Sequence, residues 1–122
     1  MSVSLLEVQQ ILDAEVIVGL EWINREVVTV CGSDLMSDVL SYSHESTLLL
    51  TGLTNIQVIR TAEMSDLAGV VFVQGKRPGA ELIELAGTKQ IPLLVTKHSL
   101  YEACGKLYQR GIRNCPKLGD VL

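Results

Sequence analysis

Two spacings of hydrophobic residues alternate along the chain. Short apolar runs, most of them followed by glycine or polar turn residues, are typical of β-strands. Between these runs, apolar residues recur three and four positions apart, which is the spacing of an amphipathic helix. The pattern predicts strands over 15–18, 27–31, 47–51, 68–73 and 91–95. It predicts helices over about 4–13 and 33–42, and helices that begin near 54, 78 and 99.

Capping residues mark where these helices should begin. A capping box pairs a Ser or Thr N-cap with Glu or Gln three residues later, and three such pairs are Ser4–Glu7, Thr54–Gln57 and Ser99–Glu102. Ser33 is a candidate N-cap with Asp34 in the first turn, where the helix dipole favours an acid. Pro78 suits the first turn of the helix that follows it. The predicted buried stripes include Leu35, Met36, Val39 and Leu40, and later Leu100, Ala103, Cys104, Leu107 and Tyr108.

Strands that alternate with helices predict an α/β fold. Repeated strand–helix–strand units give a parallel sheet with helices on both faces. We expect one domain over residues 1–122, with a mostly parallel sheet of about five strands and a loosely held tail at 113–122. The strand at 15–18 lacks a helical connection to the next strand, so its direction stays open: it either pairs antiparallel or lies at an edge.

Composition and charge narrow the class of partner. The chain is 48% hydrophobic but only 4% aromatic, so the core should be aliphatic. A small domain with this much apolar sequence often covers part of its apolar surface with a second copy, so we expect a homodimer. The net charge of −4 argues against binding nucleic acid or an anionic membrane through a basic face. The longest apolar run, 67–73, is too short to span a bilayer.

Cysteine usage gives no framework for a disulfide or a metal. Cys31, Cys104 and Cys115 are odd in number, and no two have C-x-x-C spacing. The N-terminus shows no targeting segment. We therefore expect a cytoplasmic protein with reduced thiols and with no metal or cofactor.

The predicted strand ends gather the candidate binding residues. Ligands of open α/β sheets bind beyond the carboxyl ends of parallel strands. Helix N-termini there offer free backbone amides, glycines let a phosphate approach them, and lysine or arginine supplies positive charge. The candidates are Gly32, Ser33, Gly52, Thr54, Gly75, Lys76, Arg77 and Lys97. The alternative is ordinary turn and capping chemistry with solvated charges, because no complete nucleotide-binding motif is present.

Candidate catalytic groups are few. Asp34 and Asp38 share a helix face, where two acids are more typical of a solvated surface than of a metal site. His44 and His98 have no Ser or Cys partner at a recognisable spacing, so we expect no catalytic residues. The length suits a response-regulator receiver, but Gly52 stands where the phosphoacceptor Asp would be. A phosphorylatable serine, Ser33 or Ser99, stays open.

Five stretches in order resemble the DRTGG domain family. They are NREV at 24–27, GSDLMSDVL at 32–40, LLLTG at 48–52, VFVQGKRP at 71–78 and IPLLVT at 91–96. The literal Asp-Arg-Thr-Gly-Gly string is absent, and the nearest glycine loops are 51–54 and 74–77. The family resembles in fold the N-terminal domain of HPr kinase/phosphorylase and occurs as an accessory region of some phosphotransacetylases and CBS-containing pyrophosphatases.

The resemblance implies a parallel α/β fold, frequent dimerisation and a regulatory role. Together with the residues above, it predicts a non-catalytic regulatory or ligand-sensing module. The ligand would be an anionic, phosphorylated or nucleotide-like metabolite, and the partner a regulated enzyme or signalling protein. The alternative is a protein-interaction adaptor that has no small-molecule ligand.

Overall fold

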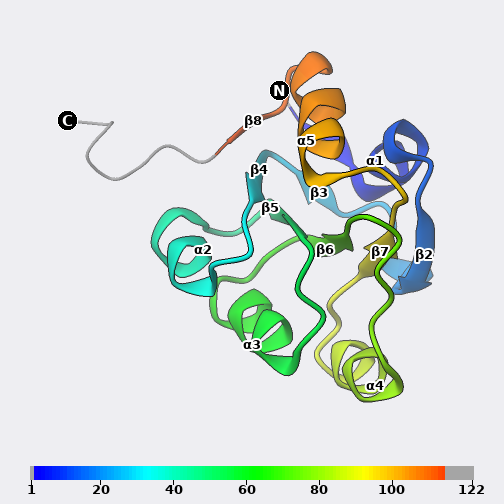
Figure 1. The fold of residues 1–122 in the computed structure, drawn as a ribbon, viewed down its shortest axis with the longest axis vertical. Helices are drawn as coiled ribbons and strands as arrows, with labels where there is room; N and C mark the ends of the chain where they lie inside the picture. The colour runs from blue at the N-terminus through cyan, green and yellow to red at the C-terminus, as the bar shows by residue number, and fades with distance from the viewer. Residues whose placement is uncertain (1, 115–122) are drawn as a thin grey trace.

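A six-stranded, mostly parallel sheet forms the centre of the protein (Figure 1). The computed structural model describes residues 2–114. From one edge to the other, the sheet runs β2 (Glu15–Val18), β7 (Leu93–Val95), β6 (Gly69–Phe72), β5 (Thr47–Thr51), β4 (Thr29–Gly32) and β8 (Arg113–Asn114). The strands from β4 to β7 are parallel, as expected from their helical crossovers. β2 pairs antiparallel with β7 at one edge, which decides the direction that the sequence left open.

Helices cover both faces of this sheet (Figure 1). One face carries α1 (Leu5–Leu12) and α5 (Leu100–Gln109). The other carries α2 (Met36–Tyr42), α3 (Ile56–Met64) and α4 (Ala80–Thr88). A short 3₁₀ turn (Leu20–Trp22) and a small antiparallel pair, β1 (Val3–Ser4) with β3 (Glu26–Val27), complete the described elements. The α/β class and the arrangement of the helices are therefore as predicted.

Alternation along the buried strands divides the core into two layers. On β5, Leu48 and Leu50 face the layer under α1 and α5, while Leu49 faces the layer under α2, α3 and α4. All three leucines have no exposed surface. Strands buried on both faces read as continuous apolar runs, which is why 47–51 and 68–73 stand out in the sequence.

The predicted start of α2 is wrong. The chain stays extended past Gly32, because the Ser33 amide donates to the Leu50 carbonyl at 3.1 Å. The Ser33 hydroxyl accepts from the Leu35 amide at 3.0 Å and so forms a turn, not a cap. The helix begins only at Met36 and has no side-chain cap. Leu35, predicted to be buried, is 58% exposed in consequence.

Other boundaries also shift by one or two residues. Asn55, not Thr54, caps α3, because its side chain accepts from the Gln57 amide. Pro78 is buried before α4, which begins at Ala80 after Gly79. The capping box predicted at Ser4 holds, with both of its hydrogen bonds present. Ser99 caps α5 through the Glu102 amide, but the Glu102 carboxylate accepts from the Ser99 hydroxyl and so does not complete a box.

Two positions predicted to be buried, and part of the predicted tail, also differ from the structure. Leu40 and Tyr108, both placed in buried stripes, are 39% and 58% exposed. Residues 113 and 114 of the predicted tail form β8, which pairs in parallel with β4, and the rest of that tail lies outside the described residues. Cys115 is among the latter. Across residues 2–114, no helix has the length and apolar character needed to span a membrane.

Candidate functional site

The carboxyl ends of β4, β5, β6 and β7 share one edge of the sheet, because these four strands are parallel. The segments that leave this edge carry all eight candidate residues from the sequence, and we call this edge with its four connecting loops the rim. β4 ends at Gly32 and leads into Ser33, β5 leads into Gly52 and Thr54, β6 into Gly75, Lys76 and Arg77, and β7 into Lys97.

Asp34 links the ends of β4 and β5. Its Oδ1 accepts a hydrogen bond from the Thr51 hydroxyl at 2.8 Å and another from the Gly52 amide at 2.7 Å. Sequence reasoning placed Asp34 on a solvated helix face and did not single out Thr51. The delayed start of α2 changes this, because it leaves Asp34 in a loop that can reach across to β5. An acid directly after a strand-terminating Gly-Ser was the available signal.

Lys76 faces the same point from the β6 loop. A Cβ built on Gly52 would lie 3.3 Å from Lys76 Nζ, 3.6 Å from Asp34 Oδ2 and 3.7 Å from Asp34 Oδ1. Within residues 2–114, the Lys76 ammonium makes no ion pair or hydrogen bond. The absence of a side chain at Gly52 thus leaves a small space between an ammonium group and a carboxylate.

Much of the rim's backbone is already hydrogen bonded. The amide of Gly52 donates to Asp34, and the amide of Gly75 donates to the Thr96 carbonyl at 2.8 Å. The neighbouring Gln74 amide donates to the carbonyl of His98 at 2.8 Å. These two bonds tie the β6 loop to the β7 loop and bring the segments of Lys76 and Lys97 together. The side chains, more than the glycine amides, are therefore the groups that a ligand would meet.

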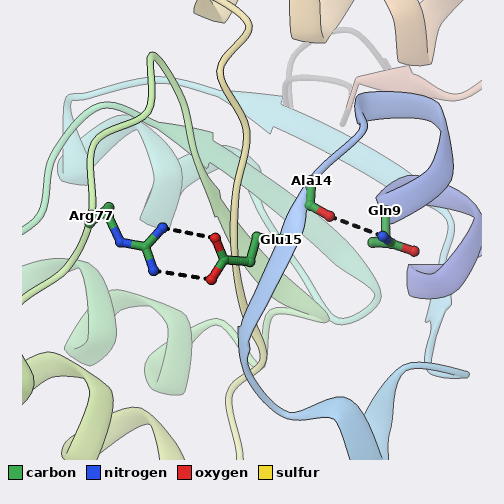
Figure 2. A network of polar contacts seen from close by, with 4 residues as sticks. All are labelled: Gln9, Ala14, Glu15 and Arg77. Atoms are coloured by element: carbon green, nitrogen blue, oxygen red, sulfur yellow. Dashed lines mark hydrogen bonds and ion pairs between the residues drawn. The ribbon is translucent and has the colours of Figure 1, made fainter.

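Arg77 is paired within the protein. Figure 2 shows its guanidinium against Glu15 of β2, with Nη1 donating to Oε1 at 2.9 Å and Nη2 to Oε2 at 3.1 Å. The hydrogen bonds and the positive charge lower the pKa of Glu15, and the carboxylate raises that of Arg77. Both side chains are more than half exposed, so the pair ties the β6 loop to the sheet edge without a large gain in stability. Figure 2 also shows Gln9 donating to the carbonyl of Ala14, just before β2.

Lys97 and Thr54 are the outer candidates. The ammonium of Lys97 is exposed and has no ion pair in the described part of the chain. Thr54 is half-buried and precedes the Asn55 cap, so it lies next to the start of α3 without capping it.

Gly32 has a packing role. A Cβ on Gly32 would lie 2.7 Å from the Cys104 sulfur and 3.4 Å from Leu100 Cδ1, both on α5. Burial is the main reason that the pKa of the Cys104 thiol is raised, and the charge of Cys31 is the second. Such a thiol is poorly reactive.

Gly32 and Ser33 also border a pocket of about 250 Å³ between α2 and the β4 edge. Asp38, Tyr42 and Asn114 complete its polar lining. Because Asn114 belongs to β8, this pocket lies beside the β8 edge of the sheet.

A pocket of about 410 Å³ lies at the opposite end of the strands, next to the residues that precede β5, β6 and β7. Its charged groups are largely satisfied within the protein. Arg25 donates to the Gln90 carbonyl at 3.1 Å and lies over the Trp22 ring, and Lys89 pairs with Glu63 at 2.9 Å. We therefore assign this pocket a structural role, despite its size, and place the candidate site at the rim.

In the described part of the chain, the side chains considered for catalysis or metal binding make local structural contacts. In residues 2–114, no three His, Cys, Asp or Glu side chains lie together as a metal site would require. The His44 ring contacts the carbonyl of the adjacent Glu45, at 3.0 Å. Ser99 caps α5 and donates to Glu102. Thr51 likewise donates to Asp34, so the two hydroxyl–carboxylate contacts described at the rim belong to a helix cap and to a link between strand ends.

Comparison with known proteins agrees with this architecture. The profile of the DRTGG domain matches residues 7–109. The chain belongs to the DRTGG domain family. No curated protein matches the sequence.

A solved structure has the same fold. It is a crystal structure of the CBS and DRTGG domains of the regulatory region of Clostridium perfringens pyrophosphatase, complexed with the activator diadenosine tetraphosphate. The TM-score is 0.72 at 19% sequence identity, over 87% of this chain and 46% of that one. This DRTGG chain thus spans less than half of the structure that it matches. At this identity, the likeness establishes the fold and leaves the ligand and the assembly to be argued from the site.

Proposed function

We propose that this DRTGG protein is a non-catalytic regulatory module that binds an anionic, phosphorylated or nucleotide-like metabolite at the rim. Binding would be relayed to an enzyme or signalling partner, with a homodimer as the working unit. A cytoplasmic location stays a prediction from cysteine usage.

One observation carries the proposal: Lys76 presents an ammonium group, unpaired within residues 2–114, where the ends of β4, β5 and β6 meet. Lys97 adds a second cation from the loop that is hydrogen bonded to the Lys76 loop. The nine-residue α4 begins after Gly79 with no side-chain cap, so its positive end adds to the field. Charge of this kind attracts an anion, and the shortage of catalytic groups favours binding over turnover.

The family supports a regulatory role. The pyrophosphatase region to which this fold is similar is described as regulatory and was crystallised with a nucleotide activator. That region holds CBS domains as well, so the similarity supports a sensing function without assigning the nucleotide to the DRTGG part.

Thermal unfolding with phosphorylated metabolites and nucleotides tests the proposal. A ligand at one hundred times its Kd should stabilise the fold by about 2.7 kcal/mol, which raises the melting temperature by several degrees. Lys76→Gln and Lys97→Gln should each reduce that rise. Lys106→Gln, an equal charge loss on the exposed face of α5, should leave it unchanged. The absence of stabilisation by every compound would refute ligand sensing.

The homodimer is tested separately. Size-exclusion chromatography with light scattering should give twice the mass of the 13.3 kDa chain. A strict monomer at high concentration would remove this part of the proposal and leave the ligand site standing.

Two exposed tyrosines favour a second candidate, the adaptor. Tyr101 is 88% exposed and Tyr108 is 58% exposed, both on α5. Large aromatic side chains are enriched at protein interfaces. Purification of a stable partner under conditions where no metabolite binds, with loss of the complex in Tyr101→Ser, would favour the adaptor.

A further inference from the structure

The space above Gly52 is bounded by groups of opposite charge. Asp34 is held there by two hydrogen bonds to Oδ1, from the Thr51 hydroxyl and the Gly52 amide. Its Oδ2 and the Lys76 ammonium both lie within contact distance of the position that a Gly52 Cβ would take, at 3.6 and 3.3 Å. In the described chain, Lys76 and Asp34 make no ion pair with each other. A group the size of a methyl or hydroxyl above Gly52 would therefore contact both side chains.

The chemistry of this space selects the group that enters. A bare phosphate oxygen would gain the ammonium group but would lie against the carboxylate, and like charges at about 4 Å repel each other. The Gly52 amide, which would otherwise offer a hydrogen bond to phosphate, is already used by Asp34. A hydroxyl suits both neighbours, because it donates to a carboxylate and accepts from an ammonium group.

We propose that Asp34 and Lys76 form a hydroxyl subsite above Gly52, which makes the ligand a phosphorylated polyol, such as a sugar phosphate or the ribose phosphate of a nucleotide. This inference rests on the proposed function and narrows its ligand class. The hydroxyl lies between Asp34 and Lys76, and the phosphate lies on the Lys97 side of Lys76. The backbone bonds that join the β6 and β7 loops hold these two lysine-bearing loops side by side.

A matched pair of small probes tests the subsite on the wild-type protein. Glycerol 3-phosphate and n-propyl phosphate carry the same charge and chain length, but only the first has hydroxyls. Their Kd values can be measured by titration of amide chemical shifts. Hydrogen bonds to charged groups predict that glycerol 3-phosphate binds about ten-fold more tightly or better. Equal affinities would overturn the subsite.

The variant Asp34→Asn should weaken the binding of glycerol 3-phosphate and strengthen the binding of inorganic phosphate. The Asn oxygen still accepts from Thr51 and Gly52, so the fold is retained, while the other carboxylate oxygen becomes an amide donor. Glycerol 3-phosphate should bind about ten-fold more weakly. Inorganic phosphate should bind about five-fold more tightly, because the repulsion is gone. Asp66→Asn is the control, since Asp66 lies in the pocket at the opposite end of the strands and its left-handed backbone tolerates Asn.

The outcomes separate this inference from the proposed function. If no phosphorylated compound binds the wild-type protein, the proposed function and the subsite fall together. If both phosphorylated probes bind but Asp34→Asn changes glycerol 3-phosphate and inorganic phosphate in the same direction, the subsite alone is overturned. Opposite changes, with no effect of Asp66→Asn, support it.

Discussion

Substitution of Gly32 by alanine should destabilise the fold through one contact with α5. The new Cβ would lie 2.7 Å from the Cys104 sulfur, which is several tenths of an ångström inside an ordinary contact. The sulfur is half-buried between α5 and the sheet, so the helix or the side chain has to move. Gly32 has no left-handed backbone, so alanine brings no backbone strain.

The magnitude follows from two opposing terms. Overpacking of this kind costs about 1–3 kcal/mol, and the lower entropy of the unfolded alanine chain offsets about 0.4–1 kcal/mol. We expect a net loss of about 1–2 kcal/mol in the free energy of unfolding. For a domain of this size, this lowers the melting temperature by roughly 5–10 °C.

A double-mutant cycle isolates the contact. Urea denaturation followed by circular dichroism would give the free energy of unfolding of Gly32→Ala, Cys104→Ala and the pair. Removal of the sulfur should relieve the clash, so the pair should cost about 1 kcal/mol less than the sum of the single losses. Gly105→Ala is the control, because a Cβ there meets nothing within 4 Å and alanine favours the helix. A stable Gly32→Ala, or losses that add within about 0.5 kcal/mol, would refute the packing role of Gly32.

Three further outcomes are expected. The stability of Gly52→Ala should stay within about 1 kcal/mol of the wild type, because the nearest atom to the new Cβ is the mobile end of Lys76. The variant should nevertheless bind glycerol 3-phosphate more weakly in the amide chemical-shift titration, and unchanged binding would contradict the site. In a carboxyl NMR titration, Glu15 should have a pKa below the ordinary 4.5 and return to it in Arg77→Gln. The stability from this pair should be present above pH 4.5 and be lost as the pH falls through the lowered value, and an unshifted titration would exclude the pair in solution. Cys104 should react with iodoacetamide at pH 8 more slowly than a free cysteine, and rapid alkylation of the folded protein would argue against burial. The free energy of unfolding should fall above pH 9.0, because the Cys104 thiol loses its proton in the unfolded chain before it does so in the folded protein.

Local patterns were sufficient for most of the fold. Strands β2 and β5 occupy the predicted residues, because continuous β-branched and leucine runs between turn residues have few alternatives. The Ser4 and Ser99 caps were equally predictable, since each uses only contacts within one helical turn. The predicted start of α2 was wrong for the opposite reason. The hydrogen bond from the Ser33 amide to the Leu50 carbonyl joins two segments that are separated in sequence, and it outweighs the local capping signal.

The candidate site was predictable in place and not in detail. Parallel strands bring their carboxyl ends to one edge whatever the side chains are, so the eight candidates gather as the sequence indicated. Whether each group is available depends on partners that no local pattern reveals. Arg77 is paired with Glu15, sixty-two positions away, and the Gly52 amide is taken by Asp34.

The sequence by itself did not show β1 or β8 and did not separate β3 from β4. It did determine the order of the other strands and of the α-helices and the parallel centre of the sheet, and it predicted the edge at which a ligand would bind. These follow from periodicity and from the handedness of crossovers, which are properties of short segments. Only the tertiary structure decided that β2 pairs antiparallel, that Gly32 makes room for α5 and that Asp34 and Lys76 face each other across Gly52. Those features depend on the distances between side chains of different elements, and such distances exist only once the sheet has brought the elements together.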